Sequence, residues 1–310
     1  MKSAKLNGDR PRRPTASVVV PAWNAGATLA ACLESLLSQD FPAEDREIIV
    51  VDNDSIDNTA EIASRYPVRL VFEREVHTCA GAKNRGIREA QGGIIAMIDS
   101  DATAAPEWLA EGVRACREGA DIVGGAVQIT YHSRHSLCEA YDRLMYMNQE
   151  RYVRELGFSA GCNTFARREV FRVTGLYLPG LRWSEDVEWA WRATAAGFSL
   201  DYCPKALIYH PARGNLRSLL RKAHFAGRGT VQLGRLRGHS SQQMIRPRSL
   251  LASGVGTLAA KIRADAATDW SQLPGLLALH NLLKIARLRG VLEGCLRDRT
   301  QVSKWVVPAL

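Results

Sequence analysis

The sequence predicts an α/β protein with a doubly wound, mostly parallel sheet, followed by a basic helical region. Three observations support this fold class. Short apolar runs rich in Val and Ile alternate with helical patterns over the first hundred residues. The runs are apolar at nearly every position, which is typical of strands buried on both faces by helices. Polar clusters follow three of the runs, and in such a sheet the strands' carboxyl ends carry the binding residues.

The expected elements can be placed in chain order. Strands are expected at 17–20, 48–51, 68–72 and 94–98, and helices at 28–38, 59–65 and 79–90. Later strands are expected at 121–127, 200–203 and 206–209, with a helix opening near Glu185. A strand–helix–strand alternation of this kind builds a Rossmann-like sheet covered on both faces. Beyond Pro211 the chain is expected to be helical.

The charge is distributed unevenly. The chain of 310 residues carries +9 overall, but residues 211–310 contain 17 Lys and Arg against four Asp and Glu, a balance of +13. A basic region of this kind suits an anionic partner, either lipid headgroups or nucleic acid. The preceding residues carry −4 in total, which disfavours a nucleic-acid channel. We therefore expect an anionic membrane surface as partner and no nucleic acid.

The chain is expected to divide into three parts. Residues 1–14 are basic, contain proline and lack the apolar core of a signal peptide, so a disordered leader is expected. Residues 15–212 form the expected catalytic domain, and 213–310 the basic helical region. The apolar runs at 250–260 and 270–283 are shorter than the roughly 20 residues of a spanning helix. Seven scattered cysteines fit a reduced compartment, so we expect a cytoplasmic protein, peripheral on the inner face of the membrane.

Asp99-Ser100-Asp101 directly follows the expected strand at 94–98. Both carboxylates then leave the sheet on the same side, at the end of a central strand. Hard oxygen ligands suit Mg²⁺ or Mn²⁺, and such an ion can bridge a diphosphate and stabilise its charge as it leaves. The pattern predicts a metal site at Asp99 and Asp101.

Two further segments are candidates for nucleotide binding. Asp52 and Asp54 follow the strand at 48–51 and can accept hydrogen bonds from a nucleobase or a ribose. Lys83 and Asn84 lie on the helix expected at 79–90. A solvated basic face explains Lys83 equally well, so both interpretations stay open.

The segment around Asp186 offers a candidate base. Glu185 and Asp186 open a helix, where acidic residues are also favoured by the helix dipole. In the functional interpretation Asp186 is a general base that removes a proton from a substrate, and the ring of Trp183 forms a wall on which a substrate stacks. His210 follows the strand expected at 206–209 and is either a third metal ligand or a buried, hydrogen-bonded histidine.

The motifs together resemble glycosyltransferase family 2, which has the GT-A fold. The shared stretches appear in the family's order and are residues 17–24, 51–57, 81–86, 99–101, 161–163 and 185–186. The resemblance implies an inverting, single-displacement reaction that uses Mg²⁺ or Mn²⁺. A sugar would pass from a nucleotide diphosphate sugar to an acceptor hydroxyl deprotonated by Asp186, with Glu185 beside it.

The resemblance also implies roles for individual residues. The residues expected to bind the donor are Pro21, Ala22, Asn24, Asp52, Asp54, Lys83, Asn84, Asp99 and Ser100. The metal ligands implied are Asp99, Asp101 and His210, and the acceptor is expected near Trp183, Cys162 and Asn163. Lys83 stands where many relatives have arginine, which keeps the charge and loses the bidentate fork. We favour a UDP-sugar as donor.

The Q-x-x-R-W signature of polymer-forming members is absent. We therefore expect transfer of a single sugar to the hydroxyl of a saccharide, a lipid or a small molecule. The basic region favours a lipid-linked or membrane-proximal acceptor among these. Leu216, Leu219, Leu220 and Ala223 form an apolar stripe next to basic residues. This stripe predicts either an amphipathic helix on anionic lipid, which we favour, or packing against the catalytic domain.

Two rival functions fit the sequence less well. A nucleotidyltransferase would need a glycine-rich, arginine-bearing loop after the first strand, and Pro21 to Gly26 contains no arginine. A non-catalytic nucleotide-sugar or carbohydrate-binding relative usually loses an acid, whereas Asp99, Asp101 and Asp186 are all present. The transferase is therefore the favoured function.

Overall fold

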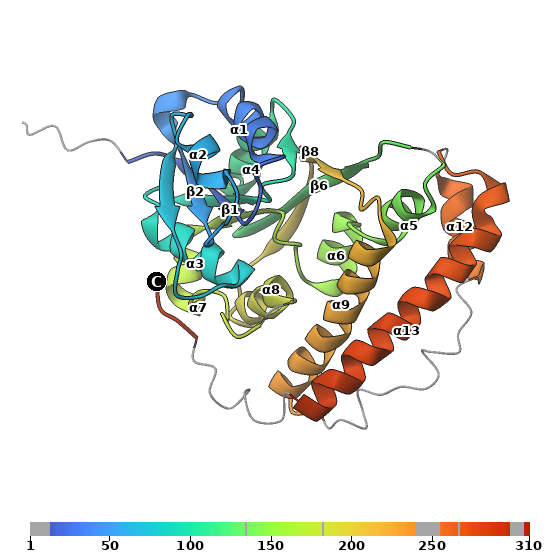
Figure 1. Ribbon diagram of the computed structural model, residues 1–310. Coiled ribbons are helices and arrows are strands. Elements are labelled where there is room, and N and C mark those ends of the chain that lie inside the picture. The colour runs from blue at the N-terminus through green and yellow to red at the C-terminus, as the bar shows by residue number, and fades with distance from the viewer. Residues whose placement is uncertain (1–12, 134, 182, 240–254, 266, 298–306) are drawn as a thin grey trace, which may run out of the picture.

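The structure is a computed structural model that describes residues 13–133, 135–181, 183–239, 255–265, 267–297 and 307–310 (Figure 1). An α/β body lies at the amino-terminal end, and a group of long helices lies beside it. The leader predicted at residues 1–14 falls almost wholly outside the described residues.

One eight-stranded sheet forms the centre of the α/β body, with strand order β3-β2-β1-β4-β7-β6-β8-β5. The strands are β1 Ala16–Ala22, β2 Arg46–Asp52, β3 Arg69–Phe72, β4 Ile94–Ile98, β5 Thr103–Ala104, β6 Ile122–Thr130, β7 Asn163–Arg167 and β8 Leu200–Pro211. The first four are mutually parallel, whereas β7 runs antiparallel to both β4 and β6. The predicted doubly wound sheet is confirmed, with a mixed second half.

Helices cover both faces of the sheet. The helices α1 Leu29–Leu37, α2 Thr59–Ala63 and α4 Trp108–Arg117 share one core, and α3 Cys79–Glu89, α7 Arg168–Thr174 and α8 Glu185–Ala195 share the other. Alternation along β1 explains the division, because Val18 and Val20 enter the first core and Val19 enters the second. The uninterrupted apolar runs in the sequence arise from this two-sided burial.

Several elements differ from the sequence-based expectations. The helix α4 and the strand β7 were not predicted, and β7 begins at the polar residue Asn163. Two strands were expected where the single strand β8 runs from Leu200 to Pro211. Gly125 pairs with Cys203, but Ala126 pairs with Leu207, so the intervening residues form a bulge in one continuous strand.

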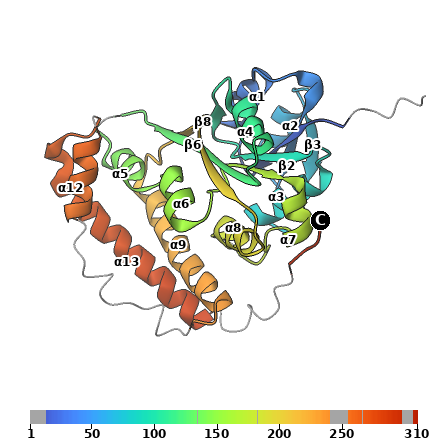
Figure 2. The same cartoon turned by 180° about the vertical axis from the view of Figure 1, so that it is seen from behind.

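The carboxyl-terminal helices form a core of their own. The helices α9 Leu216–Leu236, α12 Val255–Ala264 and α13 Leu273–Arg297 pack with α5 Leu137–Met145, which precedes the boundary predicted at residue 212. Figures 1 and 2 both show α9 between α13 and the α/β body, with α6 Gln149–Leu156 close to α9. Short 3-10 turns at Ala43–Asp45 and Trp270–Gln272 complete the described elements.

Part of the apolar stripe on α9 faces inward, whereas Leu216 at its start is 41% exposed. Leu219 is 0% exposed and Ala223 is 3% exposed, and both belong to the core shared with α5, α12 and α13. The lipid-facing interpretation is therefore wrong for Leu219 and Ala223, and these two residues pack within the helical region and not, as the alternative expected, against the catalytic domain. The helix cannot offer the same side chains to a membrane, because α13 already covers them.

Candidate active site

The predicted polar clusters meet at one edge of the sheet. Ala22 at the end of β1 pairs with Asp52 at the end of β2, and β4 runs parallel to β1 on its other side. The residue after β4 is Asp99. Antiparallel β7 begins beside this point, since Ile98 pairs with Asn163. The parallel strands therefore deliver Asp52 and Asp99 to a common edge, as the sequence predicted.

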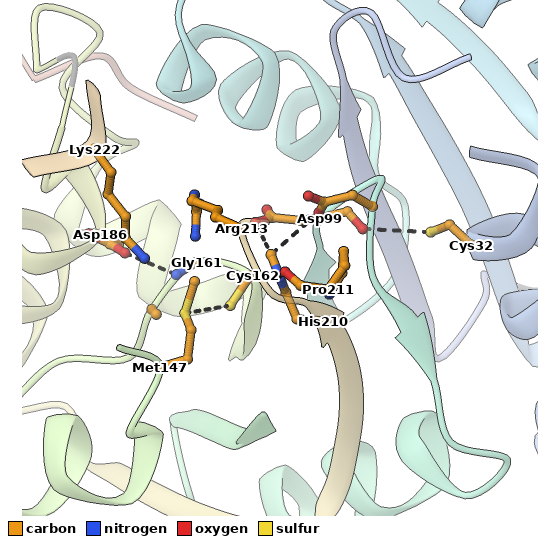
Figure 3. A network of polar contacts seen from close by, with 12 residues as sticks. Cys32, Asp99, Met147, Gly161, Cys162, Asp186, His210, Pro211, Arg213 and Lys222 are labelled. Atoms are coloured by element: carbon orange, nitrogen blue, oxygen red, sulfur yellow. Dashed lines mark hydrogen bonds and ion pairs between the residues drawn. The ribbon is translucent and has the colours of Figure 1, made fainter. Parts of the chain in front are cut away.

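Asp99, Asp101 and His210 converge into a group suited to a metal ion. One possible ligand atom from each lies within 4.8 Å of the others. His210 Nε2 is 3.4 Å from Asp101 Oδ1 and 3.8 Å from Asp99 Oδ2. The ring's Nδ1 contacts the carbonyl of Pro211 at 3.0 Å, an arrangement in which Nδ1–H donates and Nε2 keeps its lone pair (Figure 3). Two carboxylates and this imidazole fit a divalent cation.

The three side chains influence one another's ionisation. Burial opposes ionisation of Asp99, but the hydrogen bond with His210 holds the pKa of Asp99 below its usual value. Burial raises the pKa of Asp101. The pKa of His210 is raised, because the two carboxylates outweigh the effect of burial. The two carboxylates therefore stabilise the protonated form of His210, and a bound metal cation would replace that proton.

Asp186 is held by two backbone amides. The N–H of Gly161 donates to Oδ2 at 3.0 Å, and the N–H of Val187 donates to Oδ1 at 2.8 Å. Ser184, with φ of 69°, is in the left-handed region immediately before α8 and directs the chain into the helix. Burial and the neighbouring Glu185 raise the pKa of Asp186 to about 6. At neutral pH this carboxylate is ionised and more basic than an ordinary aspartate.

Lys83 does not face the solvent. Its Nζ lies 2.9 Å from Glu185 Oε1 in the interior, and 5.5 Å from the centre of the Tyr177 ring. Burial disfavours the charged form, but the Coulombic effects of Cys79, Glu185 and Tyr177 hold the pKa of Lys83 well above its ordinary value. The solvated-face interpretation of Lys83 is therefore wrong, and this lysine anchors the start of α8.

The residues predicted for the nucleotide line the ends of β1 and β2. The Oδ1 atom of Asp52 accepts a hydrogen bond from the N–H of Ser55. Asn24, with φ of 49°, connects the loop after β1 to the loop after β2. Its N–H donates to Ser55 Oγ, and its Oδ1 accepts from the N–H of Ile56. Asp54 is exposed and lies 3.6 Å from His77. Pro21 and Ser100 are half-buried, and Ala22 is buried at the end of β1.

Two residues predicted to contact the acceptor, Asn163 and Cys162, are buried in the interior. Asn163 is 0% exposed, and its side chain accepts from Trp108 Nε1 and donates to the carbonyls of Ala126 and Ala206. Cys162 is buried beside the sulfur of Met147. These contacts leave no surface for an acceptor, so the acceptor role expected for these two residues does not fit this structure.

Asn84, which was predicted to bind the donor, is also buried. Its amide makes reciprocal hydrogen bonds with the backbone of Tyr177 and does not face the nucleotide loops. Trp183, by contrast, is half-buried and stands against α9, where a Cβ on Gly229 would lie 3.1 Å from its Cβ. Trp183 therefore keeps part of its surface exposed while it contacts α9.

A buried charge cluster near the metal group was missed from the sequence. Asp142 is 0% exposed and binds two cations, Lys222 at 3.2 Å and Arg213 at 3.3 Å. The backbone N–H of Arg213 also donates to Asp142. Only the position of Arg213, three residues after His210, could have indicated its place. Asp142 and Lys222 lie on different helices, and no spacing relates them.

Comparison with known proteins identifies the family of this chain. Residues 17–175 match the family model described as glycosyl transferase family 2. Glycosyltransferase AglE of Haloferax volcanii is 33% identical over 226 residues, which is 71% of this chain and 74% of that protein. The chain belongs to glycosyltransferase family 2. It is therefore a glycosyltransferase with the GT-A fold.

A shorter match adds little beyond the family. The uncharacterized glycosyltransferase YibD of Escherichia coli K12 is 40% identical, but the match covers 27% of this chain and 25% of that protein.

Solved structures of similar fold contain donors. A mannosyltransferase from Pyrobaculum calidifontis in complex with GDP-Man and Mn²⁺ has a TM-score of 0.62 and 21% identity, covering 93% of this chain and 88% of that one. TarS of S. aureus in complex with UDP-GlcNAc has a TM-score of 0.53 and 17% identity, covering 90% and 91%. At these identities the likeness concerns the fold.

Among the residues that the structure describes, none of the helices combines the length and the apolar character that crossing a bilayer requires.

Proposed function

We propose that this family 2 enzyme transfers one sugar, with inversion, from a nucleotide diphosphate sugar to an acceptor hydroxyl. The observation that carries the proposal is the position of Asp99, Asp101 and His210 at the same sheet edge as the nucleotide loops. Residues 15–212 would form the catalytic domain and 213–310 the helical region.

The donor is proposed to lie across the ends of β1, β2 and β4. Asp52 would accept a hydrogen bond from the nucleobase, with Pro21, Ala22, Asn24 and Asp54 around it. Asp99 and Ser100 would face the ribose. Asp99, Asp101 and His210 would hold Mg²⁺ or Mn²⁺, which supplies positive charge to the departing diphosphate. We propose a UDP-sugar as the first donor to test and a GDP-sugar as the second, since similar folds hold UDP-GlcNAc and GDP-Man.

Asp186 is proposed as the general base. Its carboxylate is fixed by the N–H groups of Gly161 and Val187, and its pKa of about 6 suits a base that works at neutral pH. It would take the proton of the acceptor hydroxyl as that oxygen bonds to the anomeric carbon from the face opposite the leaving diphosphate. Glu185, paired with Lys83, positions Asp186, and Trp183 would stack on the acceptor.

The acceptor is proposed to be presented at the cytoplasmic face of a membrane. The side chains on the outer face of α13 support this location, because Ile285 is 65% exposed and Leu296 is 74% exposed, with Leu292 between them. Arg289 is exposed on the same face and has no ion-pair partner among the residues that the structure describes. An apolar stripe that contains arginine suits an anionic bilayer.

The proposal can be tested by measuring ligand binding and turnover. Thermal unfolding would be followed with nucleoside diphosphates and their sugar conjugates, with and without Mn²⁺ or Mg²⁺. We expect one nucleotide to stabilise the protein in a metal-dependent way, and Asp101→Ala to abolish that dependence. Release of the diphosphate and the anomeric configuration of the product would then be measured. A product with retained configuration would refute inversion, and repeated addition of sugars to one acceptor would refute single transfer.

A further inference from the structure

The turn that leads into α8 lies against a glycine of α9. A Cβ atom added to Gly229 would lie 3.0 Å from Ser184 Oγ and 3.1 Å from Trp183 Cβ, which is closer than most Cβ contacts in folded proteins. Gly229 is buried, and α9 runs beside α8 in both views of the molecule (Figures 1 and 2). The absence of a side chain at Gly229 therefore allows the helix and the turn to approach each other.

Ser184 has an unusual backbone conformation at this contact. Its φ of 69° lies in the left-handed region, which a residue with a Cβ atom adopts at an energetic cost. Among the described residues, the hydroxyl of Ser184 makes no hydrogen bond that caps α8. Its carbonyl accepts the N–H of Glu188 and so begins the helix. Packing around the turn must therefore stabilise this conformation, and α9 provides part of that packing.

The opposite side of α9 is held by α13. A Cβ atom on Gly227 would lie 2.1 Å from the carbonyl oxygen of Arg287, and one on Gly290 would lie 2.0 Å from the carbonyl oxygen of His224. The two helices are therefore in backbone contact, and α9 cannot move toward α13. A side chain added at Gly229 would instead displace the turn before α8 by a few tenths of an ångström.

The turn precedes the proposed base directly. Asp186 is the second residue of α8, and its carboxylate accepts hydrogen bonds from the N–H groups of Gly161 and Val187. Gly161 lies before β7, so a movement of α8 changes the distance between Asp186 and Gly161. Catalytic groups must be held to within about 0.5 Å. A misplacement of about 1 Å can lower a rate about a hundredfold. The contact with α9 therefore bears on turnover.

We propose that Gly229 is a positioning residue, through which α9 holds Trp183 and Ser184 in place and so directs Asp186 toward the acceptor. The proposal rests on the function proposed above. The family model ends at residue 175, so α8 and α9 both lie beyond it. Gly229 has no side chain to contact a substrate and acts only through the turn. The helical region then takes part in turnover as well as in locating the acceptor.

The full chain would be assayed with Gly229→Ala and Gly229→Val, below the melting temperature of each variant. We expect kcat to fall about threefold to tenfold for the Ala variant and further for the Val variant, because the larger side chain displaces the turn more. The Kd of UDP and of GDP with Mn²⁺ should match the wild type, since the donor loops follow β1 and β2. Adding Ser184→Gly to Gly229→Ala removes the crowded hydroxyl and should restore part of kcat, with Ser184→Gly alone as the reference.

Gly294→Ala is the matched control. Its new Cβ atom would lie 3.1 Å from the Cβ of Val231, so it crowds α9 to a similar degree from α13 and away from the turn. We expect this variant to lower the melting temperature and to leave kcat unchanged. If Gly294→Ala lowered kcat as much as Gly229→Ala, or if both variants of Gly229 kept the wild-type kcat, the proposal would be overturned.

Amide hydrogen exchange tests the same contact without a substrate. We expect Gly229→Ala to speed exchange at the N–H of Glu188, which bonds to Ser184, and at the N–H of Gly161, which bonds to Asp186. Gly294→Ala should change neither rate. If the wild type transferred no sugar from any donor, the proposed function would fail. The exchange rates would still test the contact, and unchanged rates at both amides would show that Gly229 does not hold the turn.

Discussion

Lys83 on α3 and Glu185 at the start of α8 are separated by 102 residues in sequence and form a buried ion pair of 2.9 Å. The pair fixes the first turn of α8, where Asp186 is located. Gly161, whose N–H donates to Asp186, also lies against this lysine, since a Cβ on Gly161 would be 2.3 Å from Lys83 Nζ. Lys83 therefore contacts both Glu185, which precedes Asp186, and Gly161, which donates to it.

We expect Lys83→Met to destabilise the protein by about 3–5 kcal/mol, because Glu185 would remain buried and uncompensated. Urea unfolding measures this loss. The double variant Lys83→Met with Glu185→Gln should recover much of it, since no unpaired charge remains. A loss below about 1 kcal/mol for the single variant would contradict a buried pair of this kind.

Turnover should depend on the ionisation of Asp186. The base must be deprotonated, so we expect the rate to fall as the pH decreases through about 6. Asp186→Asn should lower kcat by about 10²–10⁴-fold and remove this limb of the pH profile. Glu188→Gln, which changes an acid on the same helix that pairs with Arg192, is the control. An unchanged profile in the Asn variant would exclude Asp186 as the base.

Asn163 should act through stability. We expect Asn163→Ala to cost about 1–3 kcal/mol per group left unsatisfied, because Trp108 Nε1 and two buried carbonyls lose their partner. Denaturant unfolding tests this, with the exposed Asn281→Ala as the matched control. If the variant were as stable as the wild type and only the KM for the acceptor rose, the acceptor role expected from the sequence would be restored.

The outer face of α13 should bind anionic lipid. We expect Ile285→Glu with Leu296→Glu to weaken sedimentation with anionic vesicles by about tenfold or more, because two apolar side chains lose their place in the bilayer interface. Neutral vesicles should bind weakly in all cases. Val173→Glu, which alters a residue of α7 that is 59% exposed, is the control. If the double variant bound vesicles as well as the wild type, this face would not be the lipid-binding surface. If the wild type were a dimer and the double variant a monomer, the face would instead contact a second copy of the chain.

The sequence was sufficient for the parallel half of the sheet. Strands such as β1 and β4 are apolar at nearly every position because helices cover both faces, and this pattern is local in sequence. The carboxylates that follow such strands lie at a common edge because of the geometry of parallel pairing. The sequence could therefore place Asp52, Asp99 and Asp101 near one another. The resemblance to the family then supplied Asp186.

The antiparallel part could not be predicted in the same way. The strand β7 begins with Asn163, whose polarity is tolerated only because Trp108 and two carbonyls satisfy it in the interior. The bulge in β8 depends on its pairing with β6, and so a proline-containing segment remained a single strand. Both features depend on partners distant in the chain.

Tertiary structure alone decided which charges face inward. From composition, Lys83 and Lys222 are indistinguishable from the solvated basic residues around them, and the stripe containing Leu219 is as suited to lipid as to a core. Burial against Glu185, Asp142 and α13 resolves each case. The physical reason is that a helix pattern specifies an apolar face, whereas the surface that covers that face is set by long-range packing.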